Sequence, residues 1–387
     1  MAELHIGDAR LKPIAEKVLA GDRLSAEEGV ALYRTSDLLA VGWLANYVRE
    51  KRHGNICYFN TNRHINPTNV CVAHCRLCAF GRDPDAKGAY TYVLEEVWER
   101  AAQGVAEGAT EFHIVGGLHP DLPFSYYTDL IRGLKQRFPH VHLKAFTMVE
   151  VQYLAKLAKM PILETLKALK EAGVDSLPGG GAEIFNPRVR KVICDHKTSG
   201  QMWLSIARMA HQIGLRSNAT MLYGHIETEE ERVEHLLLLR QLQDETHGFV
   251  AFIPLAFHPE NTGLSHLPKT TGFNDLKNIA ASRLLLDNFD HIKAYWVMLT
   301  PRIAQIALRF GADDIDGTVI EEKIYHDAGA TTEQFTPRAE LERLIREAGR
   351  VPVERDTLYN PLDRSKLPPV TARKSGEASL VTLTLNV

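Results

Sequence analysis

Short runs of apolar residues alternate with longer segments of helical apolar spacing over most of the chain. The short runs predict strands near 64–68, 111–115, 142–147, 174–177, 216–221, 249–253, 293–297 and 313–315. The longer segments predict helices near 91–107, 124–138, 150–172, 198–213, 228–246, 273–288 and 300–310. Regular alternation of this kind is typical of successive βα units that build one parallel sheet.

The number and order of these elements predict an α/β fold. We expect a (βα)8 TIM-type barrel. A partial (βα)6 barrel is the alternative, because the last two predicted strands have the weakest apolar patterns. Residues 10–50 have helical spacing, and Ser25 with Glu28 forms a capping-box motif. We therefore expect an N-terminal helical extension over 1–60, a barrel domain over 61–318, and a helical or irregular C-terminal extension over 319–387 that is loosely ordered at its end.

Three cysteines, Cys71, Cys75 and Cys78, follow the first predicted barrel strand with C-x3-C-x2-C spacing. Thiolates are the soft ligands that iron–sulfur clusters require. Three thiolates bind three irons of a [4Fe–4S] cluster and leave the fourth iron open to a small molecule. The motif therefore predicts a cluster that takes part in chemistry.

A four-ligand zinc site is the alternative interpretation of the same cysteines. Its fourth ligand would be Cys57, Cys194 or a histidine. No second C-x2-C pair and no H-x3-5-H motif lies near, which favours the cluster. We expect Cys57 and Cys194 to be ordinary buried thiols.

Composition and charge narrow the class of function. The 387 residues carry a net charge of −3, so the chain lacks the basic field that nucleic-acid binding needs, and a small-molecule substrate is expected. Five cysteines without further paired spacing argue against a disulfide framework. The longest apolar runs are too short to cross a membrane, and charges near the N-terminus argue against a signal peptide. We expect a cytoplasmic location.

Glycines follow two of the predicted strands, at the end of a barrel where active sites form. Gly116 and Gly117 follow the second strand, where they either allow close approach to a ligand or make a plain tight turn. Three glycines, 179–181, follow the fourth strand and precede Glu183. Glu183 is a candidate for binding a cofactor amine or ribose hydroxyl, or else an acid at the start of a helix.

Polar residues at the ends of later strands are further candidates. Asn218 occupies an alternate position of the fifth strand, as a ligand contact or a satisfied interior group. His258 follows the sixth strand and Arg302 begins the seventh helix. Arginine matches a carboxylate best in geometry, and either side chain is a candidate partner of a substrate carboxylate.

The cysteine motif after the first strand resembles that of the radical S-adenosylmethionine (SAM) superfamily. The resemblance implies that Cys71, Cys75 and Cys78 hold a [4Fe–4S] cluster and that SAM binds its open iron. Gly116, Gly117 and Glu183 would hold the cofactor. The residue before the third cysteine is usually aromatic in this superfamily, whereas Leu77 stands here, and Phe80 is the nearby candidate for an adenine contact.

Four segments are similar to the aminofutalosine synthase family: CVAHCRLCAFGR, PGGGAEIF, SNATMLYGHIE and GRVPVERDTLYN. This resemblance implies addition of the 5′-deoxyadenosyl radical to the alkene of 3-[(1-carboxyvinyl)oxy]benzoate, an aryl dicarboxylate, with SAM consumed as a co-substrate. Arg82, His258 or Arg302 would neutralise the substrate carboxylates. A flavodoxin or ferredoxin would supply electrons, and the oligomeric state, a homodimer included, is left open.

Three rival functions remain at this point. Cyclic dehypoxanthine futalosine synthase and the deazaflavin (F420) precursor synthases carry related cysteine loops. Phe80-Gly81-Arg82 and PGGGAEIF favour aminofutalosine synthase over the cyclase. The third rival, from a different class, is a zinc-stabilised barrel with a binding or hydrolytic role.

Overall fold

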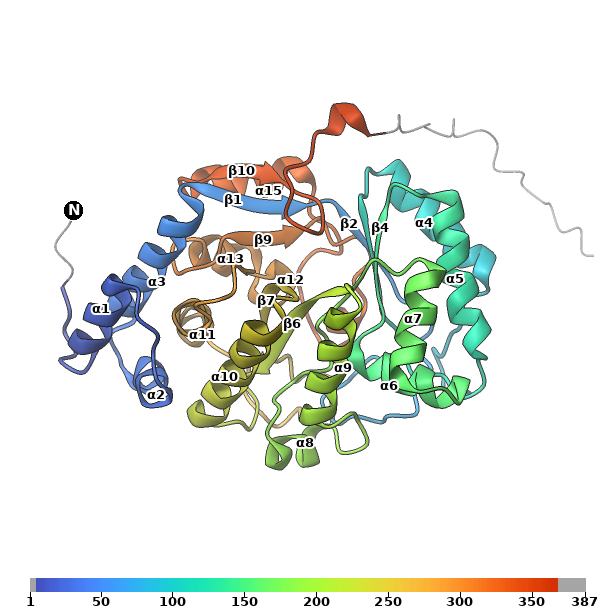
Figure 1. Ribbon diagram of the computed structural model, residues 1–387, viewed down its shortest axis with the longest axis horizontal. Helices are drawn as coiled ribbons and strands as arrows, with labels where there is room; N and C mark the ends of the chain where they lie inside the picture. The colour runs from blue at the N-terminus through green and yellow to red at the C-terminus, as the bar shows by residue number, and fades with distance from the viewer. Residues whose placement is uncertain (1–4, 368–387) are drawn as a thin grey trace, which may run out of the picture.

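A computed structural model describes residues 5–367 of the chain, and its centre is a curled parallel sheet (Figure 1). Seven strands pair in the order β2-β3-β4-β5-β6-β7-β8, and every pairing is parallel. Their bounds are β2 Asn62–Ile65, β3 Glu111–Ile114, β4 His142–Ala145, β5 Ser176–Leu177, β6 Arg216–Tyr223, β7 Phe249–Ala256 and β8 His291–Ile292. Because sequential strands are neighbours, the βα order predicted from the sequence is confirmed.

Strand β9, Asp314–Gly317, and the residues after it lie between the two edges of this sheet. A single parallel bridge joins Lys293, just after β8, to Asp314, and another joins Arg63 of β2 to Ile320. Backbone hydrogen bonds support both sides, from Ala294 N to Asp314 O (2.8 Å) and from His64 N to Ile320 O (2.9 Å). The fold is a TIM-like barrel in which regular strand pairing is incomplete at the eighth position.

Helices cover the outside of the sheet (Figure 1). Those of the barrel region are α4 Leu94–Ala106, α5 Phe124–Arg137, α6 Met148–Ala158, α7 Ile162–Ala172, α8 Pro187–Ile193, α9 Gly200–Gln212, α10 Glu229–Thr246, α11 Gly272–Leu285, α12 Trp296–Leu299 and α13 Pro301–Ala307. The helices bury one face against the sheet, as Trp203 and Ile206 of α9 illustrate, since both side chains are fully buried. In the described residues, no helix has the length and apolar character needed to span a membrane.

Segments from the early and late parts of the described chain meet in a second, three-stranded parallel sheet. Its order is β10-β1-β9, with β1 Ile56–Asn60 in the centre and β10 Val351–Glu354 at one edge. Helices α1 Leu11–Ala20, α2 Ala26–Arg34 and α3 Leu38–His53 precede β1, and the Ser25–Glu28 capping box is present. Helices α14 Ile324–Asp327 and α15 Arg338–Glu347 precede β10, and the 3₁₀ turn η1 Arg364–Lys366 follows it.

The predicted division of the chain into a 1–60 extension, a 61–318 barrel and a 319–387 extension stays a prediction. The second sheet contains strands from all three of these parts. Strands β1 and β10 come from the two predicted extensions, and both belong to the sheet that contains β9. The predicted loose order of the C-terminal end falls on residues 368–387, outside the described residues.

Two expected elements differ from the structure. The predicted strand 293–297 is wrong over most of its length, because only His291–Ile292 pairs with β7 and α12 begins at Trp296. Residues 294–297 are apolar because their side chains are buried in the interior. The single helix predicted over 150–172 is two helices, since Lys159 adopts a left-handed conformation and Pro161 precedes the second helix.

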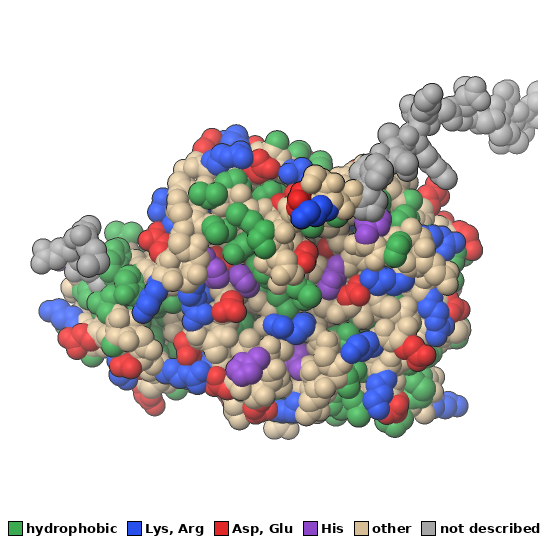
Figure 2. Space-filling view, turned by 45° about the horizontal axis from the view of Figure 1, so that its top comes forward, with side chains coloured by type: hydrophobic (Ala, Val, Ile, Leu, Met, Phe, Trp, Pro, Cys, Tyr) green, Lys and Arg blue, Asp and Glu red, His purple; other side chains and the backbone are tan. Residues whose placement is uncertain are grey.

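The surface in the view of Figure 2 mixes basic and acidic side chains without a field of one sign.

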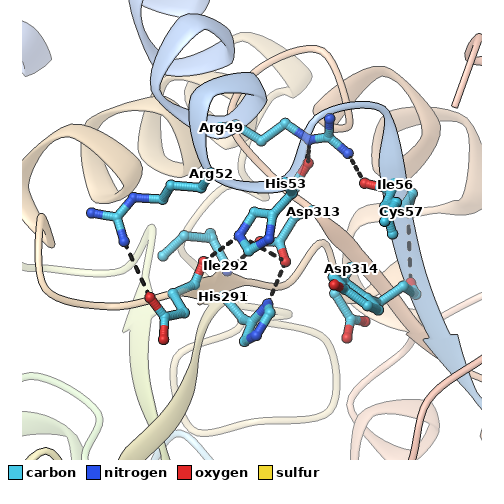
Figure 3. A network of polar contacts seen from close by, with 12 residues as sticks. Arg49, Arg52, His53, Ile56, Cys57, His291, Ile292, Asp313 and Asp314 are labelled. Atoms are coloured by element: carbon cyan, nitrogen blue, oxygen red, sulfur yellow. Dashed lines mark hydrogen bonds and ion pairs between the residues drawn. The ribbon is translucent and has the colours of Figure 1, made fainter. Parts of the chain in front are cut away.

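At the end of the barrel near β1, a buried polar network joins α3 to β8 and the start of β9 (Figure 3). His53 Nε2 and His291 Nδ1 lie 3.6 and 2.6 Å from Asp313 Oδ2. Three ligand-type atoms gather here, but the Asp313 carboxylate already accepts hydrogen bonds from Arg283 (2.5 Å) and the Ile292 amide (2.8 Å). A guanidinium in contact disfavours a metal cation, so we interpret the network as structural.

Candidate active site

A cavity lies inside the barrel and reaches the loops that follow the strands. It is lined by strand residues such as His64, His113 and Lys144, by the cysteine loop, and by residues between Asp316 and Ala328. Active sites of such barrels form at this end, where loops from several strands converge. Of the residues predicted from the sequence, the cavity brings together Cys71, Cys75, Cys78, Phe80, Gly116, Gly117, Glu183, Asn218 and His258.

The cysteine loop is held in place by its own backbone. Cys71 N donates to Arg82 O (3.0 Å), and Cys78 N donates to Cys75 O (3.0 Å), so the loop folds back on itself. All three cysteines are partly buried, line the cavity and form no disulfide. Burial raises the pKa of Cys75 to about 12. A thiolate at this position therefore needs nearby cations, as the irons of a cluster would provide.

The two glycines after β3 pack against the backbone that leads into the cysteine loop. A Cβ atom on Gly117 would lie 2.1 Å from Val70 O, and one on Gly116 would lie 3.1 Å from Thr68 O. Gly117 N also donates to Thr68 O (2.8 Å). The absence of side chains thus brings the end of β3 into contact with the segment that precedes Cys71. This packing is a structural reason for the glycines, beside their predicted contact with a cofactor.

Glu150, in the first turn of α6, anchors the same turn from the other side. Its carboxylate accepts hydrogen bonds from Gly116 N (2.9 Å), Thr147 N (2.7 Å) and Thr147 Oγ1 (2.8 Å). Its side chain is buried in the cavity wall, and this burial raises its pKa to about 7.

Glu150 should make stability depend on pH. Because its pKa in the folded protein lies above the ordinary value of 4.5, its contribution to stability is complete below that value and is lost as the pH rises through about 7. We expect the melting temperature of SAM-free protein to fall more between about pH 5 and pH 8 than that of Glu150→Gln, which cannot ionise. Thermal unfolding followed by circular dichroism measures this, and parallel pH profiles would contradict it.

The glycine run after β5 brings the backbone of two loops together. A Cβ atom on Gly179 would lie 2.8 Å from the backbone of Asn218. Glu183 follows with a positive φ of 48°. Its carboxylate lies 2.6 Å from Lys197 Nζ in a buried ion pair, which lowers the pKa of Glu183 and raises that of Lys197. Glu183 is therefore an ionised carboxylate on the cavity wall, not a helix-start acid at the surface.

Three other predicted residues line the cavity. Phe80 is buried and packs edge-on against Tyr90. Asn218 is buried on β6, and its neighbour at the next alternate position, Thr220, donates to Gly179 O (2.7 Å). His258 Nε2 lies 3.0 Å from Met298 O, whereas its Nδ1 is buried without a partner among the described residues.

The two arginines predicted from the sequence do not line this cavity. Arg82 donates to Gly81 O (3.0 Å) within the cysteine loop, and the carboxylate of Asp327 lies 3.9 Å away. Arg302 is exposed on α13. The geometry thus does not bring either guanidinium to the cavity wall, although both follow barrel strands in sequence.

Sequence reasoning missed the charged and polar groups inside the barrel. Lys144 Nζ lies 2.8 Å from Glu111 Oε2, and Lys293 Nζ lies 3.4 Å from Asp316 Oδ1. All four side chains line the cavity. The available signal was polarity at alternate positions, as in Glu111-Phe112-His113, which places successive polar side chains on the inner face of a strand.

Comparison with known proteins gives the family. A family model described as the radical SAM superfamily matches residues 65–239, and one described as the CofH/MqnC C-terminal region matches residues 246–367. The aminodeoxyfutalosine synthase of Thermus thermophilus is 52% identical over 358 residues, which cover 92% of this chain and 96% of that protein. The chain belongs to the radical SAM superfamily.

Two further comparisons place this radical SAM protein. The cyclic dehypoxanthine futalosine synthase of Streptomyces coelicolor is 39% identical, with 92% of this chain and 89% of that protein covered. The hydrogenase maturase HydG of Carboxydothermus hydrogenoformans superposes with a TM-score of 0.70 at 17% identity, covering 90% of this chain and 80% of HydG. The likeness to HydG bears on the fold alone and agrees with the TIM-like barrel.

As a radical SAM enzyme, the protein uses a [4Fe–4S] cluster and SAM as a co-substrate. The donor set fits this cofactor pair, since three thiols share one cavity wall and leave one iron without a cysteine. Lys197 adds a positive charge near Cys75, where a cluster with thiolate ligands is stabilised. Of the fourth-ligand candidates of a zinc site, Cys57 and Cys194 are buried and neither lines the cavity, whereas the histidines His64, His113 and His258 do line it.

Proposed function

We propose that this enzyme is an aminodeoxyfutalosine synthase. It would add the 5′-deoxyadenosyl group of SAM to the alkene of 3-[(1-carboxyvinyl)oxy]benzoate, with aryl rearrangement and decarboxylation, to give 6-amino-6-deoxyfutalosine and methionine for menaquinone biosynthesis. The identity of 52% to a synthase of this name, over almost its whole length, carries the proposal. The cavity has both polar and apolar walls, which supports the binding of a charged cofactor and an aryl substrate.

The residues of the cavity have distinct tasks in this proposal. Cys71, Cys75 and Cys78 would hold the cluster, which when bound supplies the electron that cleaves SAM. Gly116 and Gly117 would present their backbone to the methionine part of SAM, and the ionised Glu183 would accept a hydrogen bond from an amine or a ribose hydroxyl.

The remaining wall contributes shape and shielding. Phe80, Asn218 and His258 face the same space, and apolar neighbours such as Ile253 and Leu255 exclude water around the reacting carbon atoms. A dry enclosure protects a carbon radical from side reactions and holds the alkene near the 5′ carbon. Arg82 would act on a substrate carboxylate only if the cysteine loop moved, and Arg302 only if α13 moved, because neither lines the cavity.

The proposal also includes the setting of the reaction. A flavodoxin or ferredoxin would deliver the electron in the cytoplasm, where a reducing environment suits an oxygen-sensitive cluster. A homodimer is one possible assembly.

Cyclic dehypoxanthine futalosine synthase is the second candidate, favoured by the 39% identity to an enzyme of that name. A deazaflavin precursor synthase is a third. The lower identity supports the first proposal over the cyclase. The Phe80-Gly81-Arg82 sequence after the last cysteine of the loop also supports it over the cyclase.

Product analysis separates these candidates. Reconstituted protein is incubated without oxygen with dithionite, SAM and 3-[(1-carboxyvinyl)oxy]benzoate, and the products are identified by mass spectrometry. The proposal predicts an adduct that contains the adenosyl carbons together with the aryl group. Free 5′-deoxyadenosine as the sole nucleoside product would contradict it. Metal analysis of the same sample tests the zinc alternative, which requires zinc without iron or sulfide.

A further inference from the structure

Three polar residues form a continuous row across neighbouring strands inside the barrel. Strand pairing places His64 of β2 opposite His113 of β3, and His113 opposite Lys144 of β4. All three side chains line the cavity. The row lies within the strands, whereas the cysteines and Gly116–Gly117 lie in the loops beyond the strand ends. The row therefore lies in the deeper part of the cavity, whereas the cofactor would bind at its mouth.

The two imidazole rings of this row have unused hydrogen-bonding capacity. Their centroids are 4.5 Å apart and their planes differ by 10°, so the rings stack. Both rings face the cavity, and neither is hydrogen-bonded to another side chain among the residues that the structure describes. Burial lowers the pKa of both His64 and His113, which keeps them neutral. A neutral imidazole has one N–H donor and one acceptor nitrogen, so each ring can still offer a donor to a ligand.

Lys144 provides the positive charge of the row. Its ammonium donates to Glu111 Oε2 at 2.8 Å, and the same oxygen accepts from Thr357 Oγ1 at 2.6 Å. An ammonium has three donors, so Lys144 can keep Glu111 and bind a second acceptor. The Glu111 carboxylate accepts hydrogen bonds from both Lys144 and Thr357. It therefore keeps its hydrogen bonds when Lys144 directs another of its N–H groups to a ligand. The row thus combines two neutral donors with one cation.

We propose that His64, His113 and Lys144 form the subsite that binds the benzoate carboxylate of the aryl dicarboxylate substrate. A carboxylate has acceptors only, which matches three side chains that can each donate to it. Binding at this depth would direct the opposite end of the substrate, with its alkene, toward the cysteine loop. This inference rests on the proposed function, because that function supplies the aryl carboxylate.

Lys293 is the other interior lysine of the cavity, and it offers a matched comparison. It pairs with Asp316 at 3.4 Å and comes just after β8, which does not pair with a strand of the row, although its charge still acts on Glu111 and Lys144 across the barrel interior. No imidazole row flanks it in the strand pairing. We therefore assign the aryl carboxylate to Lys144 and not to Lys293.

The test compares the substrate with its benzoate methyl ester, in wild-type enzyme and in His64→Phe and His113→Phe. Phenylalanine preserves the stacked ring and removes the N–H donor. We expect each variant to raise the KM for the dicarboxylate about tenfold, the effect of a lost hydrogen bond to a charged group. The KM for SAM should stay unchanged. The preference for acid over ester, measured as kcat/KM, should fall by the same factor, which a purely structural role would not produce.

Lys144 is tested together with its buried partner, because Lys144→Met alone would leave Glu111 unpaired. The double variant Lys144→Met/Glu111→Gln should lose most of the preference for acid over ester, whereas Lys293→Met/Asp316→Asn should retain it. Iron content and circular dichroism confirm that each variant is loaded and folded. If one variant does not fold or does not bind iron, the acid-to-ester preference of the remaining variants of the row tests the proposal.

The outcomes separate the two proposals. A wild-type enzyme that forms the adduct, with an acid-to-ester preference unchanged in the row variants, overturns the subsite and leaves the proposed function intact. Loss of the preference in the Lys293 pair instead of the Lys144 pair also overturns it. A wild type that forms no adduct overturns the proposed function and the subsite with it.

Discussion

The Cys75→Ala variant should lose both cluster colour and all detectable turnover. Cys75 would be the middle ligand of the three, and its loss would leave two cysteines for a cluster that needs three protein thiolates. The variant should retain its fold, because Cys75 lies in a loop that lines the cavity and not in the barrel core. Iron and sulfide analysis, the visible absorption spectrum and formation of 5′-deoxyadenosine from SAM measure the expected losses.

Cys194→Ala is the matched control. Cys194 is a buried thiol at the end of α8 and does not line the cavity. It should keep its iron content and most of its turnover, because the substitution removes only a small buried group. Equal loss in both variants would contradict the three-ligand assignment and would point to Cys194 as a fourth ligand.

Gly117→Ala should produce the second large effect. Its new methyl group would lie 2.1 Å from Val70 O, so the end of β3 and the segment before Cys71 must move apart. Overpacking of this kind costs about 1–3 kcal/mol of folding free energy. Displacement of the cofactor relative to the cluster by about 1 Å can cost roughly a hundredfold in rate. We expect a lower melting temperature and a cleavage rate of SAM reduced by about that factor.

Gly7→Ala tests whether glycine replacement itself causes such losses. Its added methyl group would lie 3.4 Å from the Asp37 carboxylate, an ordinary contact at the N-terminal end of the described chain. It should leave the cleavage rate unchanged. If Gly117→Ala cleaves SAM at the wild-type rate, close packing of β3 against the cysteine loop is not needed for cofactor placement.

The repeating part of the fold was predictable from the sequence because each βα unit has a local pattern. Strands β3 and β6, and helices such as α9, start within two residues of the predicted positions. Strands β1 and β10 were missed because their pairing depends on residues almost 300 positions apart, as in Ile56 with Val351. The apolar run 293–297 was mistaken for a strand because burial outside a sheet and burial in a sheet give the same composition.

In the candidate site, too, local patterns were predictable from the sequence and contacts between distant residues were not. The place of the three cysteines and the glycines at the cavity was predictable because the C-x3-C-x2-C spacing and the glycine runs are local patterns that follow predicted strands. Lys144 and His113 were not, since a buried charge inside a barrel becomes apparent only when the strands are paired and Glu111 is seen beside it. Arg82 and Arg302 were chosen for their charge and their place after a strand, but the direction of a side chain is set by packing that the linear pattern does not contain.

Electron paramagnetic resonance of the dithionite-reduced, air-free protein tests the central claim most directly, namely that three cysteines hold a [4Fe–4S] cluster whose open iron binds SAM. The account predicts the signal of a reduced cluster that changes shape when SAM is added, and no such signal from Cys75→Ala treated in the same way. A protein that gives no signal in either condition, or the same signal with and without SAM, would contradict the account.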